Sequence, residues 1–112
     1  MANKKVDRAK IYVNSTFNNT IITLTDVNGA VLGWSTPGTV GFKGSKKSTP
    51  YAAQLATERL LQKARDFGIR SVQVLVKGTG SGRNAVINAL KGSDLRVEDV
   101  KNITPATHSS VK

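Results

Sequence analysis

TPYAAQLATERLLQKARDFG, residues 49–68, is the stretch that decides the fold of this 112-residue chain. Thr49 can cap a helix, Pro50 suits its first turn and Gly68 stops it. The apolar residues between them recur at helical spacing: Ala53, Ala56, Leu60, Ala64 and Phe67. The stretch therefore predicts one amphipathic helix, and the sequence on either side of it has a different period.

The residues before this helix predict an antiparallel meander of three strands. Apolar and polar residues alternate over 9–16, and β-branched residues dominate 20–26. Residues 17–19 tolerate a turn, and Asn28-Gly29 is a strong hairpin signal that leads into a third strand over 30–35. Trp34 lies in this third strand, and a strand tryptophan is expected to face the core.

The residues after the helix predict a strand, a second helix and a last strand. Residues 71–76 place three valines on one face, a helix follows over about 83–90, and residues 97–103 form the fifth strand. The fold class is therefore α/β, with the element order β-β-β-α-β-α-β and flanking helices. We expect one domain over residues 9–103, a basic N-terminal arm over 1–8 and a C-terminal tail over 104–112.

This element order constrains where the loops lie. Hairpins alternate the strand direction, and a helical crossover makes the fourth strand parallel to the first or the third. The loops 16–19, 37–49 and 78–82 then gather on one edge of the sheet, together with the N-termini of two helices. Ligands of open α/β sheets bind at this carboxyl edge.

The composition favours a polyanionic partner. Seventeen Lys and Arg against seven acids give a formal net charge of +10 and a pI of about 10.3, which is typical of nucleic-acid-binding proteins. No apolar run has the ~20 residues of a membrane span, and residues 1–10 lack the apolar core of a secretory signal. We therefore expect a cytoplasmic protein with no membrane contact. Zero cysteines and a single histidine, His108, argue against a metal site, and no cofactor is expected.

Two glycine-rich basic segments, residues 41–50 and 77–83, are the candidate binding site. Each precedes a predicted helix, where backbone N–H groups and side-chain charges can converge on phosphate. The cations expected to meet phosphates are Lys43, Lys46, Lys47, Lys77 and Arg83. The other residues expected to contact RNA through amides or hydroxyls are Asn18, Asn19, Gly44, Ser45, Gly80, Ser81 and Gly82.

Each of these features also has a simpler structural interpretation. The lysines can belong to a merely solvated loop, although the glycines beside them favour binding. The glycine string 78–82 can be only a tight turn, and it lacks the Gly-Lys-Ser/Thr of a nucleotide-binding loop. Phe42 can stack on a base or pin the loop onto the core, and the sequence does not distinguish between these two roles.

Catalysis finds no support in the sequence. The acids are scattered, whereas a metal-dependent nuclease needs several clustered carboxylates. A serine–histidine–acid arrangement would depend on the lone His108. We therefore expect a binding protein and no enzyme, with no small-molecule substrate. An RNA-processing nuclease and an adaptor for acidic proteins or lipids are the competing classes.

Five strings of residues together resemble a known family. They have the order and spacing found in the universal small-subunit ribosomal protein eleven family, bacterial type, and the resemblance covers roughly residues 9–108. The strings are TFNNT (16–20), WSTPG (34–38), GFKGSKKSTPYAAQ (41–54), VKGTGSGR (76–83) and TP (104–105).

This resemblance implies a fold, a role and partners. It implies a ribonuclease-H-like mixed five-stranded sheet with no nuclease site. It implies a structural constituent of the small ribosomal subunit that supports subunit assembly and translation. The rRNA would be bound on the platform, near the mRNA exit path and the anti-Shine-Dalgarno region, beside ribosomal proteins eighteen and seven. Carried over by position, the residues that look like RNA contacts are Asn18, Asn19, the 43–47 segment and residues 80–83.

The C-terminus departs from the family pattern. The bacterial family usually continues from Thr-Pro-x-Pro-His into Asn-Gly-Cys-Arg and a basic tail. This chain instead has Thr107 before His108 and continues as Ser109-Ser110-Val111-Lys112. RNA contacts by the tail are therefore not expected to carry over.

Overall fold

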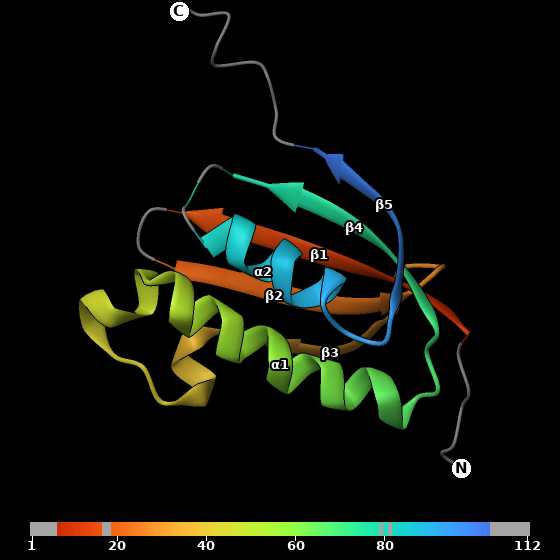
Figure 1. Ribbon diagram of the computed structural model, residues 1–112, viewed down its shortest axis with the longest axis horizontal. Coiled ribbons are helices and arrows are strands. Elements are labelled where there is room, and N and C mark those ends of the chain that lie inside the picture. Colours follow the sequence, from red (N-terminus) through yellow and green to blue (C-terminus); the bar gives the residue numbers. More distant parts are fainter. Residues whose placement is uncertain (1–6, 17–18, 79, 81, 104–112) are drawn as a thin grey trace, which may run out of the picture.

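Five strands and two α-helices build a two-layer α/β structure, shown in Figure 1. The computed structural model describes residues 7–16, 19–78, 80 and 82–103. Its elements follow the predicted order, with two short 3₁₀ helices added before the first α-helix. They are β1 (Arg8–Thr16), β2 (Asn19–Asp26), β3 (Val31–Ser35), η1 (Pro37–Val40), η2 (Gly44–Ser48), α1 (Pro50–Asp66), β4 (Ser71–Lys77), α2 (Gly82–Lys91) and β5 (Arg96–Asn102).

The sheet is mixed and has the order β3-β2-β1-β4-β5. β1 and β2 pair antiparallel, as do β2 and β3. β4 lies parallel to β1, and β5 lies parallel to β4. The expectation that the fourth strand is parallel to the first or third is thus confirmed, with β1 as its partner. The result is the mixed five-stranded sheet that the sequence predicted.

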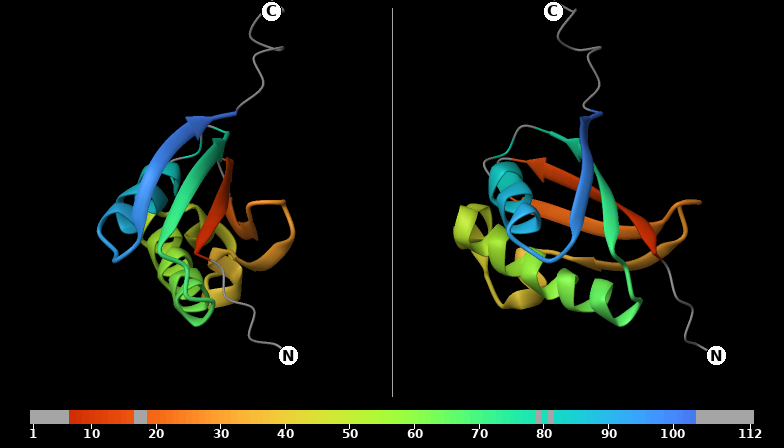
Figure 2. Two further views of the ribbon diagram at one scale, coloured as in Figure 1. Left: turned by 90° about the vertical axis from the view of Figure 1, so that its right-hand side faces the viewer. Right: turned by 45° about the vertical axis from the view of Figure 1, so that its right-hand side comes forward.

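Both helices cover the same face of the sheet, as Figure 2 shows, and they pack against each other. The core lies between these layers. On the sheet side it holds the residues of β1, β2 and β4 that alternate inward: Ala9, Ile11, Val13, Ile22, Leu24, Val72, Val74 and Val76. On the helix side it holds Ala53, Ala56, Leu60, Leu61, Ala64, Val86 and Leu90. The other face of the sheet has no helix among the described residues.

The helix α1 begins and ends as its sequence predicted. The Thr49 Oγ1 accepts a hydrogen bond from the Ala52 N–H at 3.2 Å, and Pro50 is the first helical residue. The Thr49 hydroxyl also donates to the Lys46 carbonyl oxygen at 2.9 Å. This one side chain therefore joins η2 to α1, so the preceding basic loop and the helix are held together.

One prediction about the core is wrong. The Trp34 side chain is 56% exposed, although a core position was expected. The neighbouring Gly33 is buried because it faces α1: a Cβ atom added to it would lie 2.8 Å from the Lys63 Cδ. Since adjacent strand residues point to opposite faces, Trp34 points to the face without helices.

β5 contains an irregularity that explains its weak alternation. Val97 pairs with Val72, but the next residue of β4, Gln73, pairs with Asp99. Glu98 is thus an extra residue in β5, as in a β-bulge. The expected N-terminal arm and C-terminal tail fall mostly or wholly outside the described residues, and His108 lies there too.

Candidate nucleic-acid interface

The carboxyl ends of four strands meet at one edge of the sheet. β1, β3, β4 and β5 all run toward this edge, and the antiparallel β2 starts there. The carboxyl ends of β1, β3 and β4 therefore lie along one margin, toward the left side of Figure 1. We call this margin the basic rim and define it by its described residues: 14–16, 19, 36–51, 77–78, 80, 82–83 and 101–103.

The basic rim carries charge of one sign only. Its sequence contains six cations and no acid: Lys43, Lys46, Lys47, Lys77, Arg83 and Lys101. Four of the seven acids lie at the opposite edge, since Asp7 precedes β1, Asp26 ends β2, Asp66 ends α1 and Asp94 precedes β5. The net positive charge of the chain is thus concentrated where its strand ends and helix N-termini converge.

The loop between β3 and α1 is folded rather than extended. Thr36 caps η1 by accepting a hydrogen bond from the Thr39 N–H, and the Thr39 side chain accepts one from the Thr36 N–H. Gly41 and Gly44 have φ values of 102° and 58°, and a Cβ atom added to either would meet nothing within 4 Å. Both positions therefore need glycine for their backbone angles, and both leave open space for a ligand to approach the backbone.

The loop cations sit on this folded backbone. The Lys43 and Lys46 side chains are exposed, the Lys47 side chain is partly buried, and Ser45 lies within η2. These residues precede the N-terminus of α1 directly, so their positive charge adds to that of the helix dipole.

Phe42 makes an aromatic contact that bears on its two interpretations. Its ring lies edge-on to the Tyr51 ring, with 6.0 Å between the centroids and 90° between the planes. Phe42 is partly buried and Tyr51 is 61% exposed. The contact fastens the basic loop to the first turn of α1, but the exposed Tyr51 is not part of the core, so the choice between stacking on a base and pinning the loop onto the core stays open.

The second glycine-rich segment packs against the end of β1. A Cβ atom on Gly80 would overlap the Thr16 carbonyl oxygen and the Ser15 Oγ, and one on Gly78 would overlap the Ser15 carbonyl oxygen. The Gly80 N–H donates to the Ser15 carbonyl at 3.2 Å. These glycines are therefore required by internal packing, and the Gly80 amide is already engaged within the protein.

Gly82 brings the two helix N-termini together. It is the first residue of α2 and is buried, and an added Cβ would overlap the Thr20 Oγ1 and lie 3.1 Å from the Ala53 Cβ in the first turn of α1. Only a residue without a side chain allows α2 to start this close to α1 and β2. The positive ends of both helix dipoles consequently lie at the basic rim.

The remaining predicted contacts are distributed around these loops. Arg83 is partly buried, and its Nη1 donates to the Gly78 carbonyl at 3.4 Å, while the Lys77 side chain is exposed at the end of β4. Asn19 begins β2, and its Oδ1 accepts a hydrogen bond from the Thr20 N–H at 2.9 Å. Asn18 and Ser81 lie outside the described residues.

Sequence reasoning missed Lys101 as a rim cation. It is exposed near the end of β5, and it pairs with Leu75 just before β4 ends. A signal was present, because a fifth strand parallel to the fourth places its last residues at the same edge.

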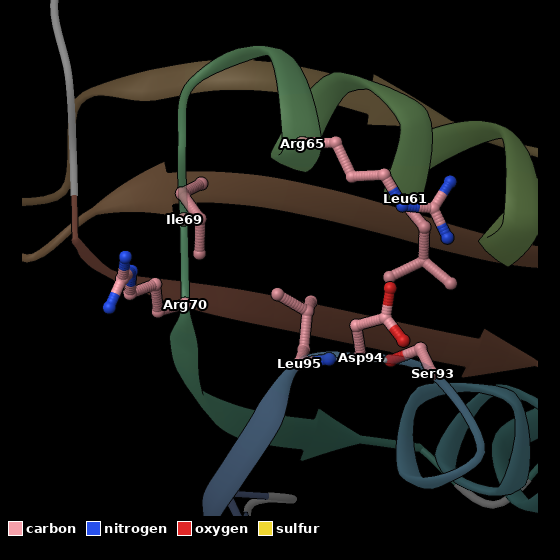
Figure 3. A pocket seen from close by; sticks show the side chains of 7 residues that line it. All are labelled: Leu61, Arg65, Ile69, Arg70, Ser93, Asp94 and Leu95. Carbon is pink, nitrogen blue, oxygen red and sulfur yellow. Dashed lines mark hydrogen bonds between the residues drawn. The ribbon is translucent and has the colours of Figure 1, made fainter.

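The hollow at the opposite edge has a different character. It has a volume of about 330 Å³ and an apolar floor of Leu61, Ile69 and Leu95. Figure 3 shows Arg65 and Arg70 around it together with Asp94. Because both signs of charge line this hollow, it lacks the one-sided field that a polyanion needs.

Among the described residues, no cluster of side chains is suited to hold a metal ion. No three of their His, Asp or Glu side chains lie close enough to hold a metal ion. No helix in this part of the chain is both long and apolar enough to cross a membrane.

A family comparison agrees with this geometry. The family model described as ribosomal protein S11 matches residues 9–112, which is nearly the whole chain. The chain therefore belongs to the ribosomal protein S11 family and is a structural, rRNA-binding protein of the small ribosomal subunit and not an enzyme.

Proposed function

We propose that the basic rim is the surface with which this protein binds small-subunit rRNA. The observation that carries the proposal is the charge distribution: the rim segments have six cations and no acid, whereas the opposite edge mixes cations with four acids. A surface of this kind attracts phosphate backbones and positions the protein on them.

The cations have distinct positions in this mechanism. Lys43, Lys46 and Lys47 contact phosphates from the loop before α1, and the open backbone at Gly41 and Gly44 lets RNA come close. Lys77 and Arg83 flank the second loop, which follows β4. The two groups reach the RNA from neighbouring loops, so they recognise the path of its backbone.

The polar contacts belong to the same rim. Asn18, Asn19 and Ser81 contact bases or ribose hydroxyls, and Ser45 and the glycines 44, 80 and 82 complete the contact surface. Since the Gly80 N–H is engaged by Ser15 and Gly82 is buried, these two glycines act mainly by shaping the loop. Specificity then comes from RNA shape and from exposed loop bases.

The finer placement in the subunit follows from the family resemblance. The motif strings support a position on the platform, near the mRNA exit path and the anti-Shine-Dalgarno region, with ribosomal proteins eighteen and seven as neighbours. In this position the protein supports subunit assembly and translation in the cytoplasm.

Crosslinking in assembled subunits tests the proposal. The chain is expected to sediment with small subunits, and ultraviolet crosslinks from residues 43–47 are expected on platform RNA. The matched control is a photoreactive residue at Arg70, which lies at the opposite edge. If position 70 crosslinks to RNA and residues 43–47 contact only solvent, the rim is not the RNA surface.

A further inference from the structure

The face of the sheet without helices carries a second surface with the chemistry of a ligand site. Strand pairing places five side chains in one row across all five strands: Trp34, Thr23, Tyr12, Leu75 and Lys101. The next row, one step closer to the basic rim, holds Ile21, Asn14 and Lys77. We call these two rows, with Ile103, the open sheet face.

This surface exposes apolar and aromatic groups that the fold leaves uncovered. Trp34 is 56% exposed, Ile21 42% and Ile103 38%. Tyr12 and Leu75 are partly buried between them. Contiguous apolar groups on a monomer surface commonly mark an interaction site.

A hollow of about 230 Å³ lies in the middle of this surface. Tyr12, Ile21 and Leu75 give it apolar walls, while Asn14, Thr23 and Lys77 bring an amide, a hydroxyl and an ammonium group to it. A nucleobase has an apolar face and polar edges, so apolar walls with a few polar groups match its chemistry.

The charges of the open sheet face favour RNA over an apolar protein segment. Its two rows contain two lysines, Lys77 and Lys101, and no acid. Lys77 also belongs to the basic rim, so the two surfaces are continuous. Trp34 and Tyr12 stand two strands apart, which is about 10 Å at the usual strand spacing. Aromatic side chains spaced on a sheet and flanked by lysines are a known platform for stacked bases of single strands.

We infer that the open sheet face binds unpaired RNA, with one base stacked on Trp34 and another in the hollow beside Tyr12. This inference rests on the proposed function and extends it, because the rim would hold backbone phosphates while the sheet face holds the bases of an adjoining single strand. Lys77 and Lys101 would contact the phosphates of that strand.

Trp34 is the only tryptophan of the chain, so its fluorescence reports on this surface alone. The probe is a 12-nucleotide oligouridylate, with an RNA duplex of equal length for comparison. We expect the single strand to quench the fluorescence of Trp34 and the duplex to leave it nearly unchanged. Trp34→Ala is expected to weaken oligouridylate binding roughly 5- to 150-fold, the loss of one stacked base. Trp34→Phe should restore part of this affinity.

Val31→Ala is the matched control. Val31 is 62% exposed and lies at the other end of β3, so its replacement also removes an exposed apolar group but should leave the affinity unchanged. The binding of both RNAs is followed independently by the anisotropy of a label on the RNA.

The outcomes separate this inference from the proposed function. If the RNAs bind by anisotropy while fluorescence and the Trp34→Ala affinity stay unchanged, the sheet face is not an RNA surface and the rim proposal survives. A photoreactive group at position 34 that crosslinks to protein instead of RNA in assembled subunits also overturns the inference. If neither RNA binds at low salt, the inference and the rim proposal both fail.

Discussion

Gly80 shows how a residue type can be predicted correctly while its reason is not. The sequence suggested that the glycines of segment 77–83 expose their amides to phosphate. In the structure Gly80 lies on the end of β1, where its N–H donates to the Ser15 carbonyl and a side chain would overlap Thr16. Glycine serves both purposes equally well in a sequence, and only the parallel pairing of β4 with β1 shows which one applies.

Gly80→Ala is therefore expected to destabilise the protein. The added methyl group meets the backbone of Thr16, which cannot rotate away, so the loss should be on the order of 1–3 kcal/mol, as for overpacked sites. Urea unfolding measures it. Gly38→Ala is the control within the same rim, because its added Cβ would have no neighbour closer than 3.5 Å. Equal stability of the two variants would contradict the packing role.

At the scale of elements, periodicity predicted all five strands and both α-helices. Periodicity did not predict features that depend on how separate elements are placed in the folded chain, or elements too short to show a period. The pattern of β3 shows that Gly33 and Trp34 face opposite sides, but not which side the helices cover. The helices η1 and η2 are too short to leave a periodic signal. Lys101 could be assigned to the basic rim only after the structure showed that β5 lies parallel to β4.

The junction of η2 and α1 gives a prediction about a single hydroxyl. Thr49→Ala removes both the cap of the Ala52 N–H and the bond to the Lys46 carbonyl. We expect a loss of about 1 kcal/mol in unfolding free energy, typical of a helix N-cap. Thr49→Ser keeps the hydroxyl and should retain most of this stability in the same thermal or urea unfolding experiment. A serine variant as unstable as the alanine variant would show that the hydroxyl is not the cause.

The edge strand β5 gives a prediction about pH. The Arg8 Nη2 donates to the Glu98 Oε1 at 3.0 Å, and this hydrogen bond, with a further one from Ser71, lowers the pKa of the Glu98 carboxyl below its usual 4.5. A lowered pKa in the folded state stabilises the fold at pH values above 4.5, and this contribution is lost as the pH falls through the lowered pKa. Glu98→Gln should thus be less stable than the parent protein at pH 7.

The difference between these two proteins is expected to shrink below pH 4.5 and to disappear in more acidic solution. Urea unfolding at a series of pH values measures it. Arg8→Gln serves as the control, since it removes the same hydrogen bond by changing its donor; it should show a pH dependence of the same direction but smaller, because Ser71 still lowers the pKa of Glu98. A difference that stays constant across the series would contradict the assigned cause.

At the scale of the whole molecule, the charge is divided between two edges of one sheet. The rim has cations only, whereas the opposite edge mixes Arg65, Arg70 and Lys91 with four acids. This separation of charge orients the molecule in the electric field of a polyanion, so that the basic rim faces the RNA as the two approach each other. The sequence predicted the basic edge, because two hairpins and a helical crossover bring the loops together, but not the position of the acids at the opposite edge.

The salt dependence of RNA binding tests whether the affinity depends on the position of the cations on the basic rim or only on the net charge of the protein. If five phosphates are neutralised, the logarithm of the affinity should fall against the logarithm of salt concentration with a slope of roughly −3.5 to −4.5. Replacing Lys43, Lys46 and Lys47 by Gln removes three contacts and should make the slope shallower by roughly two to three. Filter binding or anisotropy with a small-subunit rRNA fragment measures both slopes.

The control variant replaces Arg65, Arg70 and Lys91 by Gln at the opposite edge. It lowers the net charge by the same three units, so both variants feel the same change in long-range attraction. Because counterion release counts only the phosphates in contact, the control should keep the parental slope while the slope of the rim variant becomes shallower. If the slope becomes equally shallow in both variants, RNA binding depends on the total charge of the protein, and the basic rim is not the RNA-binding surface.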